Sequence, residues 1–126
     1  MREGPIPSSL RTWFVIHFIA DYLFALPLFL FPIQTLSLFG WTTIDPLATR
    51  LFAAALFGIG GVSLLAKDAD KKTYRSLLDL KIIWSLSAIL GLVLSLLQGA
   101  PAFSWAVLAM FIIFSSVWIY YIRLLQ

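Results

Sequence analysis

Long apolar runs separated by short polar connections are the dominant pattern of this chain. Each run is about 20 residues long, the length that a helix needs to cross roughly 30 Å of hydrocarbon. The pattern predicts membrane-spanning helices over residues 11–31, 47–66, 77–97 and 102–122. These runs lack the alternation of apolar and polar residues that strands of a membrane barrel require. We therefore expect an all-α integral membrane protein, a single domain of residues 1–126 folded as an up-down four-helix bundle.

Several residues at the ends of these runs are typical of helix boundaries. Asp45 followed by Pro46 predicts an N-cap and the first helical position of the second span. Ser76, with Asp79 three residues later, resembles a capping box at the start of the third span. Pro27 lies inside the first span, and we expect a kink there because its ring removes one backbone hydrogen bond.

Basic residues lie almost entirely on one side of the predicted spans, and Arg50 is the exception on the other side. The positive-inside rule assigns the basic side to the cytoplasm. The rule predicts a multipass protein of the cell membrane with its N- and C-termini both cytoplasmic. The residues on the basic side are Arg2, Arg11, Lys67, Lys71, Lys72, Arg75, Lys81 and Arg123.

Composition and charge narrow the class of protein. Hydrophobic residues make up 61% of the chain and charged residues only 12%, whereas a soluble domain has about 25% charged residues. The net charge is +3, but the basic residues lie in short connections and not along one polar face, which argues against a nucleic-acid partner. The chain has no cysteine, which excludes disulfides and thiolate metal sites.

Small residues recur at helical spacing on two of the spans, as they do where membrane helices pack closely. We expect two helix-packing faces, with a homodimer interface as the alternative for one of them. The residues of these faces are Ala54, Gly58 and Gly61 on the second span and Ser85, Ala88 and Gly91 on the third.

Ionisable side chains also occur at membrane depth, where they are costly and by default functional. Asp21 lies near the middle of the first span, with His17 one turn earlier on the same face. The third span would bring Lys81 to a similar depth, and the fourth span would bring Tyr120 or Tyr121 there. We therefore expect an inner-leaflet polar pocket that binds a ligand or exchanges a proton.

The same residues have a structural interpretation, in which Asp21 belongs to a buried network that fixes helix register. For His17 this structural interpretation is favoured, because a histidine near a helix end readily reaches water. Arg50 has three candidate partners: a lipid phosphate, Asp45 and Asp21. The His17 and Asp21 side chains offer fewer ligands than zinc usually takes from protein, so we predict no metal site. No motif indicates a cofactor or a catalytic residue.

The stretch from Asp45 to Ala66 is similar to the second-helix region of small DoxX-like membrane proteins. In those proteins an arginine near the helix start is followed by a glycine-rich segment, matched here by Arg50, Gly58, Gly60 and Gly61. The similarity covers only this part of the chain, and HFIADY in the first span departs from it. The resemblance implies a four-helix bundle and transfers no catalytic residue.

These patterns favour one function over two alternatives. We expect a protein that binds or carries a lipid or a small lipophilic molecule in a pocket within the bundle, with membrane lipids as partners. The first alternative is a structural or regulatory subunit of a larger membrane complex. The second is a membrane enzyme for a hydrophobic substrate that uses Asp21 and His17 as acid and base.

Overall fold

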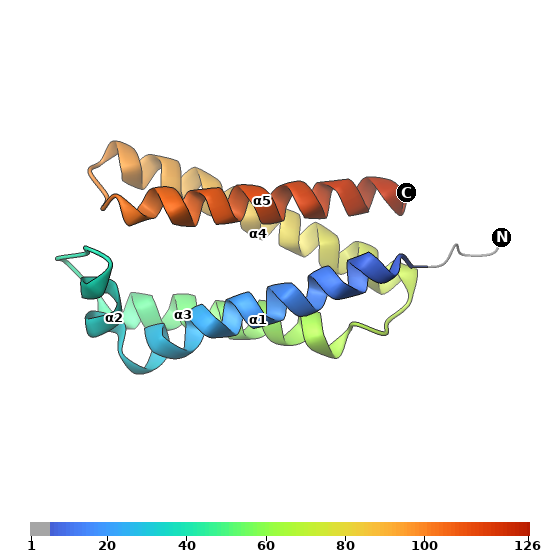
Figure 1. Ribbon diagram of the computed structural model, residues 1–126, viewed down its shortest axis with the longest axis horizontal. Coiled ribbons are helices and arrows are strands. Elements are labelled where there is room, and N and C mark those ends of the chain that lie inside the picture. The colour runs from blue at the N-terminus through green and yellow to red at the C-terminus, as the bar shows by residue number, and fades with distance from the viewer. Residues whose placement is uncertain (1–5) are drawn as a thin grey trace. The chain divides into compact units, whose positions relative to one another are not determined.

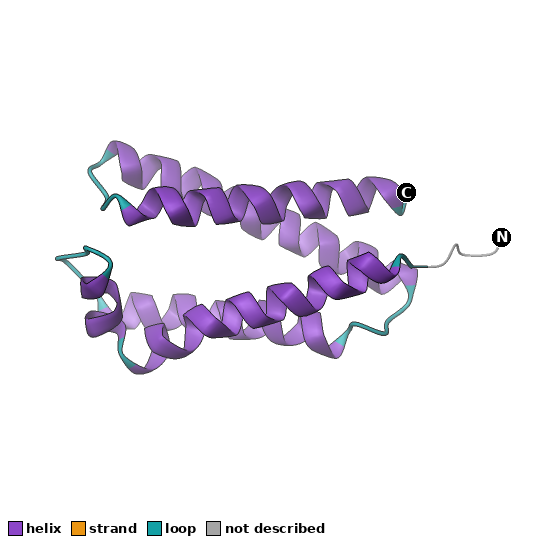
Figure 2. Ribbon diagram, viewed as in Figure 1, coloured by secondary structure: helices purple, strands orange, loops and turns teal. Residues whose placement is uncertain are grey.

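The protein is all-α in its computed structural model, which describes residues 6–126 (Figures 1 and 2). Four of its helices are long and apolar enough to cross a membrane, as the sequence predicted. Arg2, one of the basic residues used to predict orientation, lies outside the described residues. The helices are α1 (Ser8–Leu30), α2 (Pro32–Leu38), α3 (Pro46–Leu65), α4 (Lys71–Leu97) and α5 (Phe103–Leu124).

The described chain divides into two compact units, one ending at Ala69 and one beginning at Asp70. The first unit pairs α1 with α3 in antiparallel fashion and carries the short helix α2 between them (Figure 1). The second unit is a hairpin of α4 and α5. Each unit therefore contributes two helices of spanning length.

Aromatic side chains join α1 to α3. The ring of Tyr22 meets the edge of Phe57 with centroids 5.0 Å apart, and Phe29 meets the same Phe57 ring at 5.8 Å. Edge-to-face pairs of this kind contribute beyond the area that they bury. Phe57 thus lies between two α1 side chains that are separated by two helical turns.

The start of α3 is built as the sequence predicted. The Asp45 carboxylate accepts hydrogen bonds from the backbone N–H groups of Leu47 at 2.9 Å and Ala48 at 3.2 Å, and Pro46 occupies the first turn. These bonds satisfy two of the N–H groups that the first turn of any helix leaves without a helical partner.

The start of α4 differs from the prediction. The helix begins at Lys71, with Asp70 as its N-cap accepting from the Thr73 N–H at 2.9 Å, so Ser76 and Asp79 lie inside the helix. The capping box predicted at those two positions is wrong. The prediction placed the helix start where the apolar run begins. The helix starts earlier because Asp70 is a good N-cap and the first turn that follows it is polar.

Two glycines close the turns after α2 and α4. Gly40 and Gly99 have φ angles of 104° and 89°, a region that glycine enters without steric cost. Each glycine directly follows the C-cap residue of its helix and donates its N–H to a carbonyl of the final turn. The residue after each glycine also donates its N–H to a carbonyl of that turn. This double bond pattern is the Schellman motif, which satisfies carbonyl groups left over at a helix end. After α4 it produces the tight connection expected between the last two spans.

Candidate functional site

The α1 helix brings two ionisable side chains together near its middle. His17 Nε2 and Asp21 Oδ2 lie 3.3 Å apart, one turn from each other, and both side chains are more than nine-tenths buried. The contact is an ion pair when the imidazole is protonated. Because helical side chains four residues apart lie over one another, the spacing of the two residues is enough to produce this contact.

The backbone of α3 approaches Asp21 at Gly60. A Cβ atom at Gly60 would lie 2.8 Å from the Asp21 Cβ, 3.1 Å from its Oδ2 and 3.3 Å from a ring carbon of Tyr22. Only glycine fits here without displacing α1. The Asp21 side chain of the His17–Asp21 pair is therefore packed directly against the backbone of α3 at Gly60.

The packing face of α3 is rotated from the predicted one. Nothing lies within 4 Å of a Cβ built at Gly58, and Ala54 is exposed. A Cβ at Gly61 would lie 3.0 Å from the Tyr22 hydroxyl, which donates to the Phe57 carbonyl at 3.2 Å. Within this unit the contact with α1 is centred on Gly60 and not on Gly58.

The corresponding residues of α4 divide in a similar way. Ser85 is buried and donates its hydroxyl to the carbonyl of Ile82 at 3.2 Å. Ala88 is half-buried, and Gly91 has open space where a Cβ would lie. Of the predicted face on α4, the part nearest the start of the helix is thus the most enclosed.

Arg50 contacts a backbone carbonyl at the far end of α1. Its Nε donates to the carbonyl oxygen of Phe29 at 3.0 Å, and this bond goes to neither Asp45 nor Asp21, the two acidic partners considered from the sequence. The last turn of a helix has unsatisfied carbonyls and a partial negative charge. Arg50 therefore acts as a cationic cap for α1.

Lys81 and Tyr120 belong to the α4–α5 unit. Lys81 is almost completely buried, and its Nζ lies 4.9 Å from the centroid of the Trp118 ring on α5. Tyr120 is 61% exposed and stacks its edge on Tyr121. The pocket that would join Lys81 and Tyr120 to His17 and Asp21 of the first unit stays a prediction.

Trp118 is a contact that the sequence interpretation missed, although a signal was present. The connection between α4 and α5 is short, so residues at equal distance from it lie at equal depth. Counting outward from Leu97 and Phe103 places Lys81 within one residue of the level of Trp118. A cation over an aromatic face is attracted by the ring quadrupole, and desolvation strengthens the attraction.

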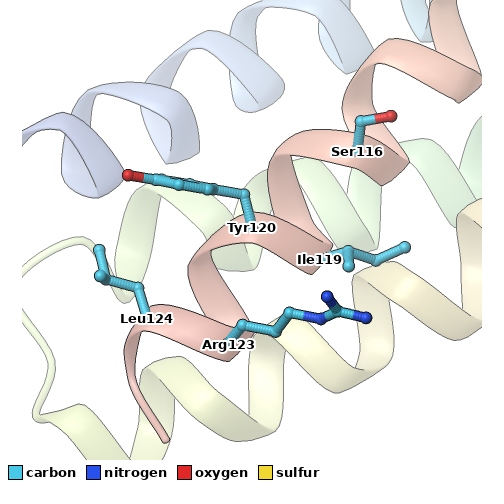
Figure 3. Close-up of a pocket in the computed structure, with 5 residues that line it drawn as sticks. All are labelled: Ser116, Ile119, Tyr120, Arg123 and Leu124. Carbon is cyan, nitrogen blue, oxygen red and sulfur yellow. The ribbon is translucent and has the colours of Figure 1, made fainter.

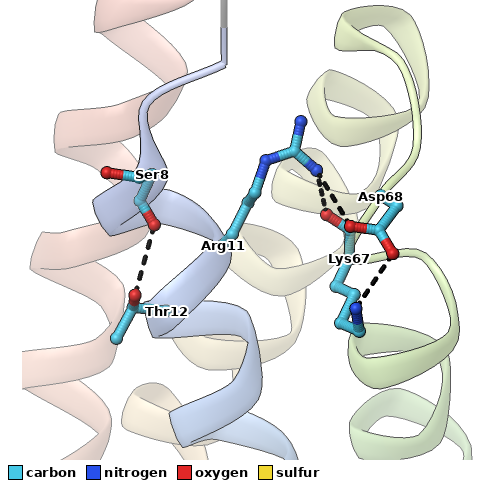
Figure 4. Close-up of polar contacts among 5 residues, drawn as sticks. All are labelled: Ser8, Arg11, Thr12, Lys67 and Asp68. Atoms are coloured by element: carbon cyan, nitrogen blue, oxygen red, sulfur yellow. Dashed lines mark hydrogen bonds and ion pairs between the residues drawn. The ribbon is translucent and has the colours of Figure 1, made fainter.

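Polar contacts join the start of α1 to the end of α3 (Figure 4). Arg11 donates to the carbonyl of Lys67 and lies 3.5 Å from the carboxylate of Asp68. The Lys67 ammonium lies 2.9 Å from the same carboxylate. The hydrogen bond and charge of Lys67, with a smaller effect from Arg11, lower the pKa of Asp68 below its ordinary value. This exposed cluster links the start of α1 to the segment that follows α3.

Within residues 6–126 no group of three or more His, Asp or Glu side chains is arranged to hold a metal ion. Comparison with protein-family models, curated proteins and solved structures gave no match. The resemblance of residues 45–66 to DoxX-like proteins stays a prediction. The function is therefore argued from the geometry of the chain.

Proposed function

We propose that this protein is a multipass protein of the cell membrane that binds a lipid or a small lipophilic molecule at the His17–Asp21 pair. The observation that carries the proposal is the 3.3 Å contact between these two buried side chains in the middle of a helix of spanning length. Charged and polar groups at membrane depth are costly, and those that persist generally serve a ligand, an ion or a proton.

The proposed topology has four spans and cytoplasmic termini. Its support is the charge distribution, in which Arg50 is the only basic residue on the side opposite the other lysines and arginines. The antiparallel pairing of α1 with α3, and of α4 with α5, is consistent with consecutive spans that alternate in direction.

The chemistry of the pair indicates the class of ligand. A carboxylate accepts hydrogen bonds, and an imidazole donates or accepts them according to its protonation state. A suitable ligand has an apolar body, which prefers lipid, and one polar group that exchanges hydrogen bonds with Asp21 or His17. A long-chain amine, an alcohol or a quinone-like headgroup satisfies these conditions.

A structural role for the pair is the second candidate, favoured by the contact at Gly60. The Asp21 side chain packs so closely on α3 that it fixes the register of α1 against α3. In this alternative the protein is a structural or regulatory subunit, and replacing Asp21 changes stability before it changes ligand binding.

Native mass spectrometry of protein extracted gently from its own membrane separates the two candidates. We expect a bound small molecule on the unmodified protein, lost in Asp21→Asn, which keeps the shape of the side chain and removes its charge. Asp79→Asn is the matched control, because Asp79 is exposed on α4.

Thermal unfolding of the same variants completes the test. Loss of the bound molecule with an unchanged unfolding temperature supports the ligand site. A lower unfolding temperature with no bound molecule in any variant contradicts the ligand site and supports the structural role.

A further inference from the structure

The last turns of α5 have a hollow on their surface. Among the described residues its lining comes from α5 alone: Ser116, Ile119, Tyr120, Arg123 and Leu124. Figure 3 shows the Arg123 guanidinium extending back along α5 toward Ile119, while Tyr120 leaves the helix in a different direction. Tyr120 and Leu124 are 61% and 53% exposed, so the hollow is open to the surroundings of the helix.

The arginines of the described chain fall into two groups by what satisfies their guanidinium. Arg11 and Arg50 each donate a hydrogen bond to a backbone carbonyl of the α1–α3 unit. Arg75 and Arg123 are exposed, and neither makes a hydrogen bond or an ion pair within residues 6–126. A guanidinium has five N–H donors and cannot lose its charge, so Arg75 and Arg123 need acceptors that residues 6–126 do not provide.

Arg75 and Arg123, which have no partner among the described residues, lie at the same end of the α4–α5 hairpin. Lys81 and Trp118 mark one level of this antiparallel pair. Arg75 precedes Lys81 and Arg123 follows Trp118 by five or six residues each, which is about 7–9 Å of helix rise. Lys71 continues the positive charge at the start of α4. This end of the hairpin therefore presents cations next to apolar surface.

We propose that the hollow on α5 binds an anionic phospholipid, with the phosphate on Arg123 and an acyl chain along Ile119. A guanidinium matches a phosphate in charge and in the geometry of its paired donors. The Ser116 hydroxyl donates to the carbonyl of Ile112 at 2.8 Å and so offers the ligand no donor. The apolar lining and its location on a helix of spanning length select a lipid over a soluble phosphate.

The direction of the Arg123 side chain suits a lipid inserted in the membrane. The Cβ of a residue in a helix points toward the helix N-terminus, so the Arg123 side chain is directed along α5 toward the apolar segment. Binding a phosphate there stabilises the guanidinium where water is scarce. The same direction brings the phosphate above the apolar part of the hollow, as an inserted lipid requires.

The test is a lipid titration of the purified full chain, monitored by native mass spectrometry. Phosphatidylglycerol and phosphatidylcholine with identical acyl chains are the two probes. We expect phosphatidylglycerol to bind more tightly, and Arg123→Gln to weaken it by about tenfold or more, the usual effect of losing a hydrogen bond to a charged group. Arg50→Gln is the matched control and should leave phosphatidylglycerol binding unchanged, because Arg50 lies on α3, does not line the hollow and donates its Nε–H to Phe29.

A second variant tests the hollow while keeping its charge. Ser116→Phe places a ring in the hollow at an exposed position and should also weaken phosphatidylglycerol binding. Retention of the lipid by a folded Ser116→Phe protein, with folding checked by circular dichroism, would overturn the proposal.

Three other results would also overturn it: equal affinity for the two lipids, equal losses in Arg123→Gln and Arg50→Gln, or displacement of the lipid by free glycerol phosphate. Asp21→Asn should bind phosphatidylglycerol normally, so this test and that of the α1 ligand fail or succeed separately.

Discussion

Replacing Gly60 with alanine tests whether α3 approaches α1 as closely as described. The new Cβ would lie 2.8 Å from the Asp21 Cβ, whereas unstrained carbon atoms lie about 3.5–4.0 Å apart. The two helix backbones must therefore separate by roughly 1 Å at this point, because no change of the Asp21 rotamer moves its Cβ. Overpacking of this kind costs about 1–3 kcal/mol.

Alanine also favours a helix over glycine by up to about 1 kcal/mol, which partly offsets the clash. Gly58→Ala measures this gain in helix propensity without a clash, because a Cβ at Gly58 would meet nothing within 4 Å. The difference in unfolding free energy between the two variants removes the propensity gain and isolates the contact. We expect Gly60→Ala to be less stable than Gly58→Ala by about 1–3 kcal/mol.

The measurement is equilibrium unfolding in mixed micelles, with SDS as denaturant and circular dichroism as readout. Equal stability of the two variants would refute the close approach at Gly60. A Gly58→Ala protein less stable than Gly60→Ala would show that the face predicted from the sequence, and not the one centred on Gly60, packs on α1.

Three further predictions concern single contacts. Arg50→Gln should lower the unfolding free energy by about 1 kcal/mol through loss of the charged cap on Phe29; no change in SDS titration would show that the bond contributes nothing. A double-mutant cycle of Lys81→Met with Trp118→Leu should give a favourable coupling of about 1–2 kcal/mol, and additive effects would contradict the contact. Asp70→Ala should remove an N-cap whose carboxyl has a lowered pKa because it accepts hydrogen bonds at the start of α4. The stabilisation by the Asp70 carboxylate is complete above about pH 5 and is lost as pH falls below about 4, through the folded pKa. The unfolding temperatures of the unmodified protein and Asp70→Ala should therefore converge in acid. A difference in unfolding temperature that stays constant with pH would refute this titration.

The helices could be predicted because an apolar run of spanning length has few alternatives. The start of α3 could also be predicted from Asp45 and Pro46, since an N-cap and a first-turn proline are local signals. The start of α4 was not predicted, because Asp70 lies in a charged segment that hydropathy assigns to a loop although helical hydrogen bonding continues through it.

The face of α3 that contacts α1 could not be predicted from the sequence. Gly58, Gly60 and Gly61 point in different directions around the helix, and each has a plausible small-residue pattern. The rotation of α3 depends on tertiary contacts with α1, such as the Tyr22–Phe57 ring pair, and helical periodicity does not contain such contacts. The His17–Asp21 contact, by comparison, follows from spacing within one helix.

The cap that Arg50 provides for α1 has a consequence for biosynthesis. When α1 leaves the ribosome, it carries an acidic residue near its centre and an end whose carbonyls await a donor located in α3. An aspartate at mid-span disfavours insertion by about 2.5–3.5 kcal/mol, and Gly60, which receives it, has not yet been synthesised. Integration of α1 should therefore become more favourable once α3 has been synthesised, because Gly60 and Arg50 then pack against these groups.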